Sequence, residues 1–312
     1  MKQSRLVKRK LEKTKKKPVI RIGKNFAKLK RHLIIFASLF VGLCLIFGFV
    51  VNSHRRRIIL AIPLSDGGVS VNVFNNRSNS ITSFKIPSET LVSASRNLGF
   101  WKIKSIWRLG IDEKLYGKLL SETLAKSFYF PVDSWASYEA NGFLSGGFGA
   151  SLSSLFSSYK TNLSFWDKIN IFLMSNTSRR DFSDLKETSL LEEAVLPDGD
   201  RGFRISNSNI QSEIVSAFAD PVLSSKSATV SIFNQGQLAN DKIVGVGMLL
   251  EMMGAKVIGS FSKGSSDFNC QVEARDKEAA FEFQRILGCS IQIAPDLGDG
   301  EFKLYLGRQF VL

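Results

Sequence analysis

The sequence predicts an α/β fold in three parts: one N-terminal transmembrane helix, an α/β domain with a mixed sheet, and a small α/β domain with two helices on one sheet. An uncharged apolar run covers residues 33–51, short alternating strands follow it, and helices alternate with strands near the C-terminus. We therefore divide the chain into a basic tail (1–32), the helix (33–51), a first domain (56–222) and a second domain (228–312).

The apolar run is long enough to cross a bilayer. Its 19 residues would reach about 28 Å as a helix, close to the hydrocarbon thickness of about 30 Å. Residues 1–32 hold 14 Lys or Arg against one acid, Glu12, so the positive-inside rule keeps the tail in the cytoplasm and places the domains outside. No small-x-small cleavage site follows, which favours a retained signal anchor over a cleaved signal peptide or a buried core helix.

The net charge of +14 is concentrated in the tail. Residues 33–312 carry 28 basic and 27 acidic side chains. The exterior therefore lacks the basic footprint of a nucleic-acid-binding protein, and no nucleic acid is expected as a partner. The tail is expected to be disordered and held near anionic lipid headgroups.

Local patterns predict the elements of the first domain. Apolar alternation and turn residues predict strands at 58–62, 69–74, 80–86 and 190–196. Helical spacing predicts helices at 112–128, with Asp112 as the N-cap, at 167–174 and within 205–218.

Residues 141–156 are rich in Gly, Ser and Phe and allow two interpretations. One is a flexible glycine loop that enters an amphipathic helix packed on the sheet. The other is a lipid-facing flap, because exposed apolar clusters close to a bilayer tend to insert into it.

The second domain has the clearest pattern. Strands are expected at 229–233, 256–261, 269–274, 290–294 and 302–306, with helices at 240–253 and 277–287 that end at Gly254 and Gly288. Cys270 and Cys289 fall on one strand and at the start of the next. The spacing allows either a disulfide or two separately buried thiols.

Several segments of the second domain resemble the C-terminal domain of LytR-type envelope proteins. They are Val230-Ser231-Ile232-Phe233-Asn234-Gln235-Gly236, Leu238-Ala239, Met253-Gly254-Ala255-Lys256-Val257 and Leu306-Gly307-Arg308-Gln309-Phe310. Three positions depart from that pattern: Gln235 interrupts the Asn-Gly turn, Ala255 replaces an aromatic residue, and Gln309 replaces an acid.

Segments of the first domain resemble, in degenerate form, the LytR-CpsA-Psr (LCP) catalytic domain. They are Leu64-Ser65-Asp66, Ile86-Pro87-Ser88-Glu89-Thr90 and Phe130-Pro131-Val132-Asp133. The resemblance implies a protein of the bacterial cytoplasmic membrane, and a family that moves glycopolymers from a polyprenyl pyrophosphate carrier to peptidoglycan. That reaction needs arginines to hold the diphosphate and a carboxylate to hold Mg²⁺ or accept a proton.

The arginines that the resemblance calls for are missing. Leu64 and Ser88 occupy their positions, and Glu89 replaces the signature aspartate. The remaining candidates are the carboxylates Asp66 and Glu89 and, for phosphate, Arg179 and Arg180. We therefore expect a non-catalytic binding or scaffolding protein of cell-wall glycopolymer assembly, whose partners are the membrane and a glycopolymer, polyprenyl lipid or another envelope protein.

Two alternatives remain. A divergent active transferase would use Asp66 and Glu89 to hold Mg²⁺, its only expected cofactor, with phosphate contacts from Arg77, Arg96, Arg179 or Arg180 converging within about 10 Å. A structural protein would use its second domain to bind an envelope partner.

The two histidines, His32 and His54, flank the apolar run. No Ser-His-Asp triad or zinc site is therefore expected outside the membrane.

Overall fold

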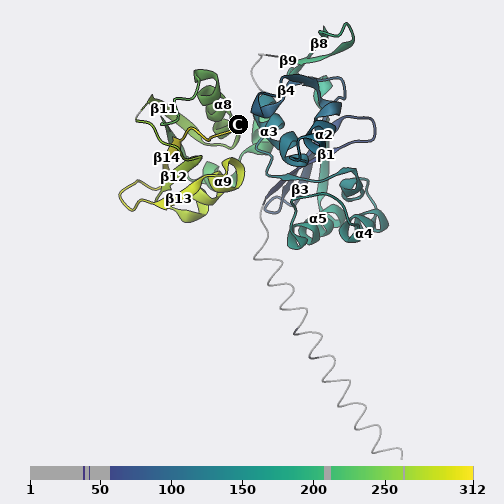
Figure 1. The fold of residues 1–312 in the computed structure, drawn as a ribbon. Coiled ribbons are helices and arrows are strands. Elements are labelled where there is room, and N and C mark those ends of the chain that lie inside the picture. Colours follow the sequence, from purple (N-terminus) through teal and green to yellow (C-terminus); the bar gives the residue numbers. More distant parts are fainter. Residues whose placement is uncertain (1–37, 39–41, 43–56, 207–211, 263, 312) are drawn as a thin grey trace, which may run out of the picture. The chain divides into compact units, whose positions relative to one another are not determined.

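The computed structural model describes residues 38, 42, 57–206, 212–262 and 264–311. Apart from Ser38 and Gly42, the predicted transmembrane segment and the whole basic tail lie outside the described residues. Among the described residues, no helix has both the length and the apolar character needed to cross a membrane. The chain separates into two units, Met1–Ser53 and His54–Leu312, and all the strands belong to the second (Figure 1).

The first domain is built on a mixed five-stranded sheet, as predicted. The strand order is β6-β1-β2-β3-β7. The bounds are β1 Ile58–Pro63, β2 Val69–Asn75, β3 Ser80–Ile86, β6 Ser134–Trp135 and β7 Arg179–Asp184. The first three strands form the expected antiparallel meander, and β6 and β7 add to its two edges in parallel.

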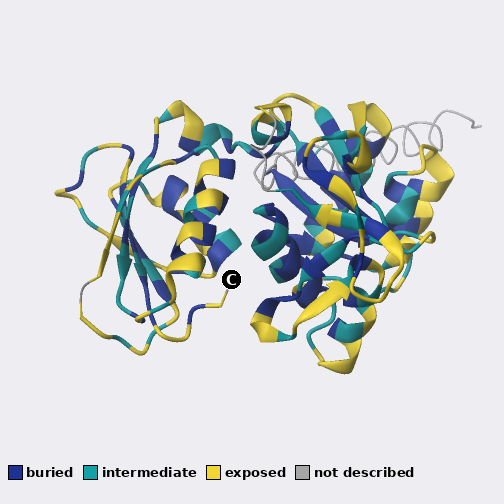
Figure 2. Ribbon diagram, turned by 90° about the horizontal axis from the view of Figure 1, so that it is seen from above, coloured by how far each residue is buried: buried dark blue, intermediate teal, exposed yellow. Residues whose placement is uncertain are grey.

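Both faces of this sheet are covered, which explains the unbroken apolar sequence of β1. Ile59 and Ala61 belong to one buried cluster, whereas Ile58 and Leu60 belong to a second cluster on the opposite face. Alternate residues of a strand point to opposite faces, so a strand buried on both sides loses the polar alternation. Figure 2 shows the buried residues gathered in the strands and on the inner sides of the helices.

The other elements of this domain are mostly short. The helices are α2 Ile103–Asp112, α3 Gly117–Phe128, α4 Phe148–Phe156, α5 Phe165–Thr177, α6 Ser212–Phe218 and α7 Pro221–Ser225. Two antiparallel pairs are β4 Leu91–Ser93 with β5 Phe100–Lys102, and β8 Leu191–Val195 with β9 Arg201–Ile205. Three 3₁₀ turns are η1 Ser95–Asn97, η2 Tyr138–Phe143 and η3 Leu185–Glu187.

One predicted helix was placed wrongly. Asp112 ends α2 and does not cap a helix, because the chain reverses before α3, and the Tyr116 amide donates to the Gly110 carbonyl at 2.6 Å. A Cβ on Gly110 would lie 2.2 Å from the Tyr116 carbonyl oxygen, so this close reversal requires glycine. The helix expected within 205–218 is α6, Ser212–Phe218, as predicted.

The second domain follows the prediction closely. Its sheet has the order β11-β10-β14-β12-β13, in which only β12 and β14 pair antiparallel. The bounds are β10 Thr229–Asn234, β11 Lys256–Ser262, β12 Cys270–Ala274, β13 Ser290–Ile293, β14 Glu301–Leu306, α8 Asn240–Met252 and α9 Lys277–Leu287. Gly254 and Gly288, at the ends of the helices, both have positive φ.

Both helices pack on one face of this sheet. A single buried cluster joins Ile232 and Leu304 of the sheet to Leu249 of α8 and Phe283 of α9. A disulfide joins Cys270 to Cys289. The structure thus decides between the two alternatives left open for these cysteines.

Candidate functional site

Asp66 lies in the tight turn between β1 and β2. Its Oδ1 accepts a hydrogen bond from the Gly68 amide at 2.9 Å, and its Oδ2 lies 2.5 Å from Lys85 Nζ on β3. The hydrogen bond from Lys85 holds the pKa of the Asp66 carboxyl below its usual range. Asp66 is therefore an ionised carboxylate that already has a cationic partner.

Glu89 follows β3 and is also neutralised by lysines. Its two carboxylate oxygens lie 2.5 Å from Lys104 Nζ and 3.0 Å from Lys102 Nζ. The hydrogen bond from Lys104 is the main reason that the pKa of Glu89 is lowered. Lys102 also pairs with Asp198 at 2.7 Å and Asp200 at 2.6 Å, and these hydrogen bonds raise its pKa.

The structure brings the two candidate carboxylates to the same end of the sheet. A Cβ built on Gly67, next to Asp66, would lie 3.3 Å from the Cβ of Ser88, next to Glu89. The lysines and carboxylates of this end form two groups of ion pairs, one around Asp66 and one around Glu89, which together we call the lysine–carboxylate cluster. Its members are Asp66, Lys85, Glu89, Lys102, Lys104, Asp198 and Asp200.

The candidate phosphate residues lie elsewhere and are used differently. The Arg180 guanidinium donates to the main-chain carbonyls of Leu144, at 2.7 Å, and Ser175. Arg179 has an 82% exposed side chain and lies 3.3 Å from Asp181. Arg180 is therefore occupied in fixing the backbone around η2 and α5, and Arg179 is a surface residue.

Strand β3 separates these arginines from the carboxylates. Arg180 pairs with Ile81 near the start of β3, whereas Val69, which follows the Asp66 turn, pairs with Ile86 at its end. Five residue steps along a strand correspond to about 17 Å. The convergence expected for an active transferase is therefore absent for Arg179 and Arg180.

The other two arginines do not complete an active site. Arg77 lies in the turn between β2 and β3, where its amide donates to Asn75 Oδ1 at 3.0 Å. It therefore lies at the same end of the sheet as Arg180, opposite the carboxylates. Arg96 binds Glu122 of α3 through two hydrogen bonds of 2.7 Å. Among the described residues, no group of three or more acidic, His or Cys side chains could hold a metal ion.

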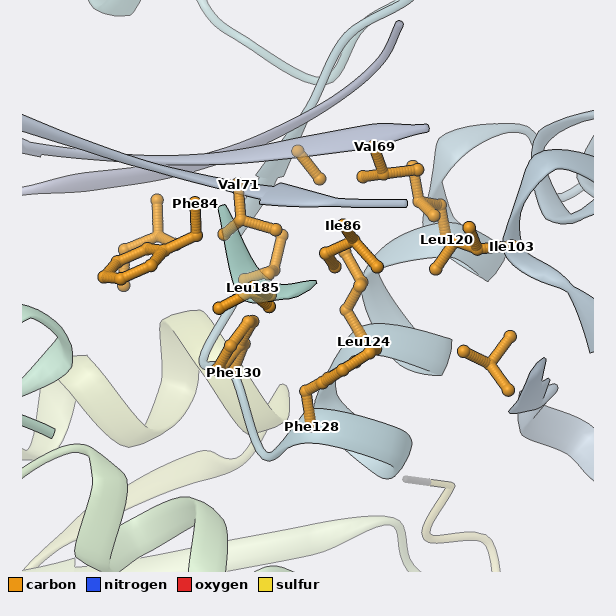
Figure 3. Close-up of a cluster of buried hydrophobic side chains, with 14 of the residues drawn as sticks. Val69, Val71, Phe84, Ile86, Ile103, Leu120, Leu124, Phe128, Phe130 and Leu185 are labelled. Carbon is orange, nitrogen blue, oxygen red and sulfur yellow. The ribbon is translucent and has the colours of Figure 1, made fainter. Parts of the chain in front are cut away.

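Aromatic side chains fill the space between the meander and α3 (Figure 3). Phe130 lies 4.4 Å from Phe218, 5.3 Å from Phe128 and 6.2 Å from Phe84, measured between ring centroids. All four side chains are at most 3% exposed. Interiors packed at this density leave few voids larger than a water molecule, so this region is a solid core.

A cleft of about 660 Å³ opens at the exposed side of α3. Its wall includes Lys118 and Glu122 of α3, Trp135, and Arg285 of α9. Arg285 forms a buried ion pair with Asp133. Asp133 belongs to the motif Phe130-Pro131-Val132-Asp133, whereas the sequence gives no signal for Arg285, because no local pattern indicates an ion pair between distant segments.

Comparisons with known proteins give low-identity structural likenesses. No family model matches the sequence, and a search of curated proteins finds no match. Among solved structures, 18 chains match. They include Bacillus subtilis TagT, with 12% identity, a TM-score of 0.35, and coverage of 49% of this chain and 85% of TagT.

Two further matches have similarly low sequence identities and TM-scores. One is described as the LytR-CPS2A-psr family protein YwtF (TagT) with bound octaprenyl pyrophosphate lipid; it is 13% identical over 49% of this chain and 85% of that chain, with a TM-score of 0.35. The other, described as a transcriptional regulator from Enterococcus faecalis, is 10% identical over 66% of this chain and 90% of that one, with a TM-score of 0.39. Likenesses at this level assign neither an activity nor a ligand.

Proposed function

We propose that this chain is a single-pass protein of a bacterial cytoplasmic membrane that binds a cell-wall glycopolymer or its lipid carrier without transferring it. The residues 33–51 serve as its signal anchor, and both folded domains lie outside the cytoplasm. The segments that resemble LytR-CpsA-Psr and LytR C-terminal domains support an envelope role, while the missing arginines argue against transfer.

The pairing of Asp66 and Glu89 with lysines carries the non-catalytic part of the proposal. A carboxylate that coordinates Mg²⁺ must offer its lone pairs to the metal. Here Lys85 and Lys104 occupy those positions at 2.5 Å. The ammonium groups would have to be displaced, and their own charge would repel the incoming cation.

The filled core implies that a bound lipid carrier would keep its polyprenyl chain outside the domain. A polyprenyl tail needs an apolar channel in order to enter the domain. Phe84, Phe128 and Phe130 close the region between the meander and α3 with stacked or tilted ring contacts. Opening a channel there would displace buried aromatic side chains, at a cost of several kcal/mol for each.

The cleft beside α3 is the best candidate for glycan binding. Its volume lies within the range of about 300–1,000 Å³ that is usual for ligand sites. Its wall includes Trp135 and the exposed cation Lys118, while Arg285 is already paired with Asp133. An aromatic residue beside an exposed lysine suits a sugar that carries phosphate.

The test uses the full chain in detergent micelles with a polyprenyl-pyrophosphate-linked oligosaccharide, peptidoglycan and Mg²⁺. We expect saturable binding by calorimetry and no release of polyprenyl pyrophosphate above a protein-free control. Lys118→Glu should weaken binding at least threefold, because it reverses a charge at the cleft. Lys186→Glu is the matched control, since its side chain is 51% exposed and lies outside the cleft wall.

Release of the lipid carrier that depends on Mg²⁺ would instead establish a transferase. Absence of glycan binding, together with crosslinking of the full chain to one membrane protein, would favour the structural, partner-binding alternative.

A further inference from the structure

Helix α4 turns its apolar face to the solvent. Phe148, Leu152 and Phe156 follow one another at four-residue spacing and are 63%, 36% and 73% exposed. Ser151 and Ser154, on the opposite face, are 0% and 2% exposed. This is the reverse of the arrangement in a helix that covers a core, where the apolar stripe faces inward.

Specific polar contacts hold the serine face against the domain. Ser154 Oγ donates to the main-chain carbonyl of Glu139 at 2.8 Å, and Ser151 Oγ donates to that of Gly142 at 3.4 Å. A Cβ on Gly142 would lie 2.2 Å from Ser154 Oγ, so α4 approaches this backbone as closely as glycine allows. The outward direction of the phenylalanines is therefore fixed by packing.

Helix α5 extends the exposed apolar area. The ring of Phe148 meets that of Phe172 at 5.6 Å in an edge-to-face contact, and Figure 1 draws α4 and α5 as neighbours. Phe165 and Leu173 of α5 are 58% and 36% exposed. We call the combined area the α4–α5 apolar surface; it consists of Phe148, Leu152, Phe156, Phe165 and Leu173.

This surface has the composition of a membrane interface. Residues 141–166 contain one charged side chain, Lys160. Trp166 lies at the end of this segment and is half-buried, and Lys168 follows it, with its Nζ 4.1 Å from the centre of the partly buried Tyr159 ring. Tyr, Trp and basic residues are enriched at the headgroup level, and they flank apolar side chains that enter the acyl region.

The surface also belongs to the end of the domain where the chain enters. Helix α5 ends at Thr177, whose carbonyl accepts from Asn79 Nδ2 at 3.4 Å, and Ile58 at the start of β1 pairs with Phe74 at this same end of the sheet. Five residues, 52–56, separate the apolar run from Arg57. Fully extended, they reach no more than about 18 Å.

We propose that the α4–α5 apolar surface docks into the outer headgroup region of the bilayer that holds residues 33–51. The proposal rests on the membrane anchor of the proposed function and adds a second membrane contact, which orients the domain. Two weak contacts joined by a short linker act together, because the anchor raises the effective concentration of the surface at the bilayer. The lysine–carboxylate cluster, at the other end of β3, then faces away from the membrane.

The experiment uses the full chain reconstituted in vesicles of phosphatidylcholine and phosphatidylglycerol, mixed 7:3. An environment-sensitive fluorophore is attached to Leu152→Cys or to Val195→Cys, each in a Cys44→Ser background that leaves the Cys270–Cys289 disulfide intact. Val195 is the matched control, because it is an apolar residue of β8 with 64% exposure. We expect the label at residue 152 to brighten several-fold, and to be quenched by lipids with a nitroxide at carbon 5, while the label at residue 195 does neither.

A water-exposed label at residue 152, in protein that stays in the vesicles after an alkaline wash, overturns the docking and leaves the anchor intact. If the label at residue 152 is buried before the wash but the alkaline wash removes the chain from the vesicles, the membrane anchor is overturned and the docking is not. The label at residue 152 could also become water-exposed when the protein is diluted at constant lipid concentration. That result would show that self-association buries the label, and it would overturn the docking. Phe148→Ser combined with Phe156→Ser should reduce quenching at residue 152 at least threefold.

Discussion

Ser154 of α4 donates a hydrogen bond of 2.8 Å to the main-chain carbonyl of Glu139 in η2. This contact turns one face of a short uncharged helix toward the protein and leaves Phe148 and Phe156 in the solvent. The stability of the helix is therefore expected to depend on its serines and its membrane affinity on its phenylalanines.

Ser154→Ala should destabilise the domain by about 1 kcal/mol, because it removes the hydrogen bond from the buried Ser154 to the Glu139 carbonyl. Phe156→Ser should change stability by less than about 0.5 kcal/mol, because the ring is already mostly exposed. Urea unfolding measures both values, and Ser153→Ala, at an exposed position of α4, is the control. A larger loss for Phe156→Ser than for Ser154→Ala would contradict the orientation of the helix.

Phe130→Ala should destabilise the first domain by about 3–5 kcal/mol, because it removes a fully buried ring and leaves a cavity. Phe100→Ala is the control, since that ring is 73% exposed and its loss should cost less than about 0.5 kcal/mol. The midpoints of urea unfolding compare the two variants. Equal midpoints would show that the aromatic cluster is not the packed core described above.

The paired state of Glu89 predicts a specific acid dependence. Its pKa is lowered from 4.5 mainly by Lys104. A carboxyl whose pKa is lower in the folded state stabilises the fold fully above its unfolded pKa, and this contribution is lost as the pH falls through the folded value. Stability should therefore decline below about pH 4.5, and Glu89→Gln should have a shallower decline. Urea unfolding between pH 3 and pH 7 measures the slopes; identical slopes would rule out the pairing.

Mg²⁺ should not stabilise the chain. Both candidate carboxylates are held by lysines, so neither offers the ion a site at which it could bind the folded state selectively. Thermal unfolding with 5 mM MgCl₂ should match unfolding with NaCl of equal ionic strength. A rise of several degrees that disappears in Asp66→Asn would support the transferase alternative.

Removal of the Cys270–Cys289 bond should destabilise the second domain by about 3 kcal/mol, the chain-entropy value for a loop of this size. The paired variant Cys270→Ser with Cys289→Ser tests this by thermal unfolding. Reductant should lower the melting temperature of the wild type and leave the variant unchanged. Equal melting temperatures for the two proteins would contradict a bond formed in solution.

The local sequence pattern was sufficient to predict an element's position wherever the element has a clear apolar pattern or a clear end signal. The strands of the meander and every element of the second domain lie within a few residues of their predicted positions. Gly254 and Gly288 marked helix ends correctly, because their positive φ is costly for other residues. Local pattern failed at α2 and α3, where helical spacing continues past the reversal at Tyr116.

The sequence by itself determined the α/β class, the antiparallel meander and the alternating strands and helices of residues 229–306, because each depends on residues that are close together in the chain. Tertiary structure decided which lysines neutralise Asp66 and Glu89, which strands border the meander, and which face of α4 points outward. These outcomes depend on contacts between segments far apart in the sequence. The sequence of α4 shows that phenylalanines and serines lie on different sides of the helix. Only the contacts of α4 with the rest of the domain determine which side is buried.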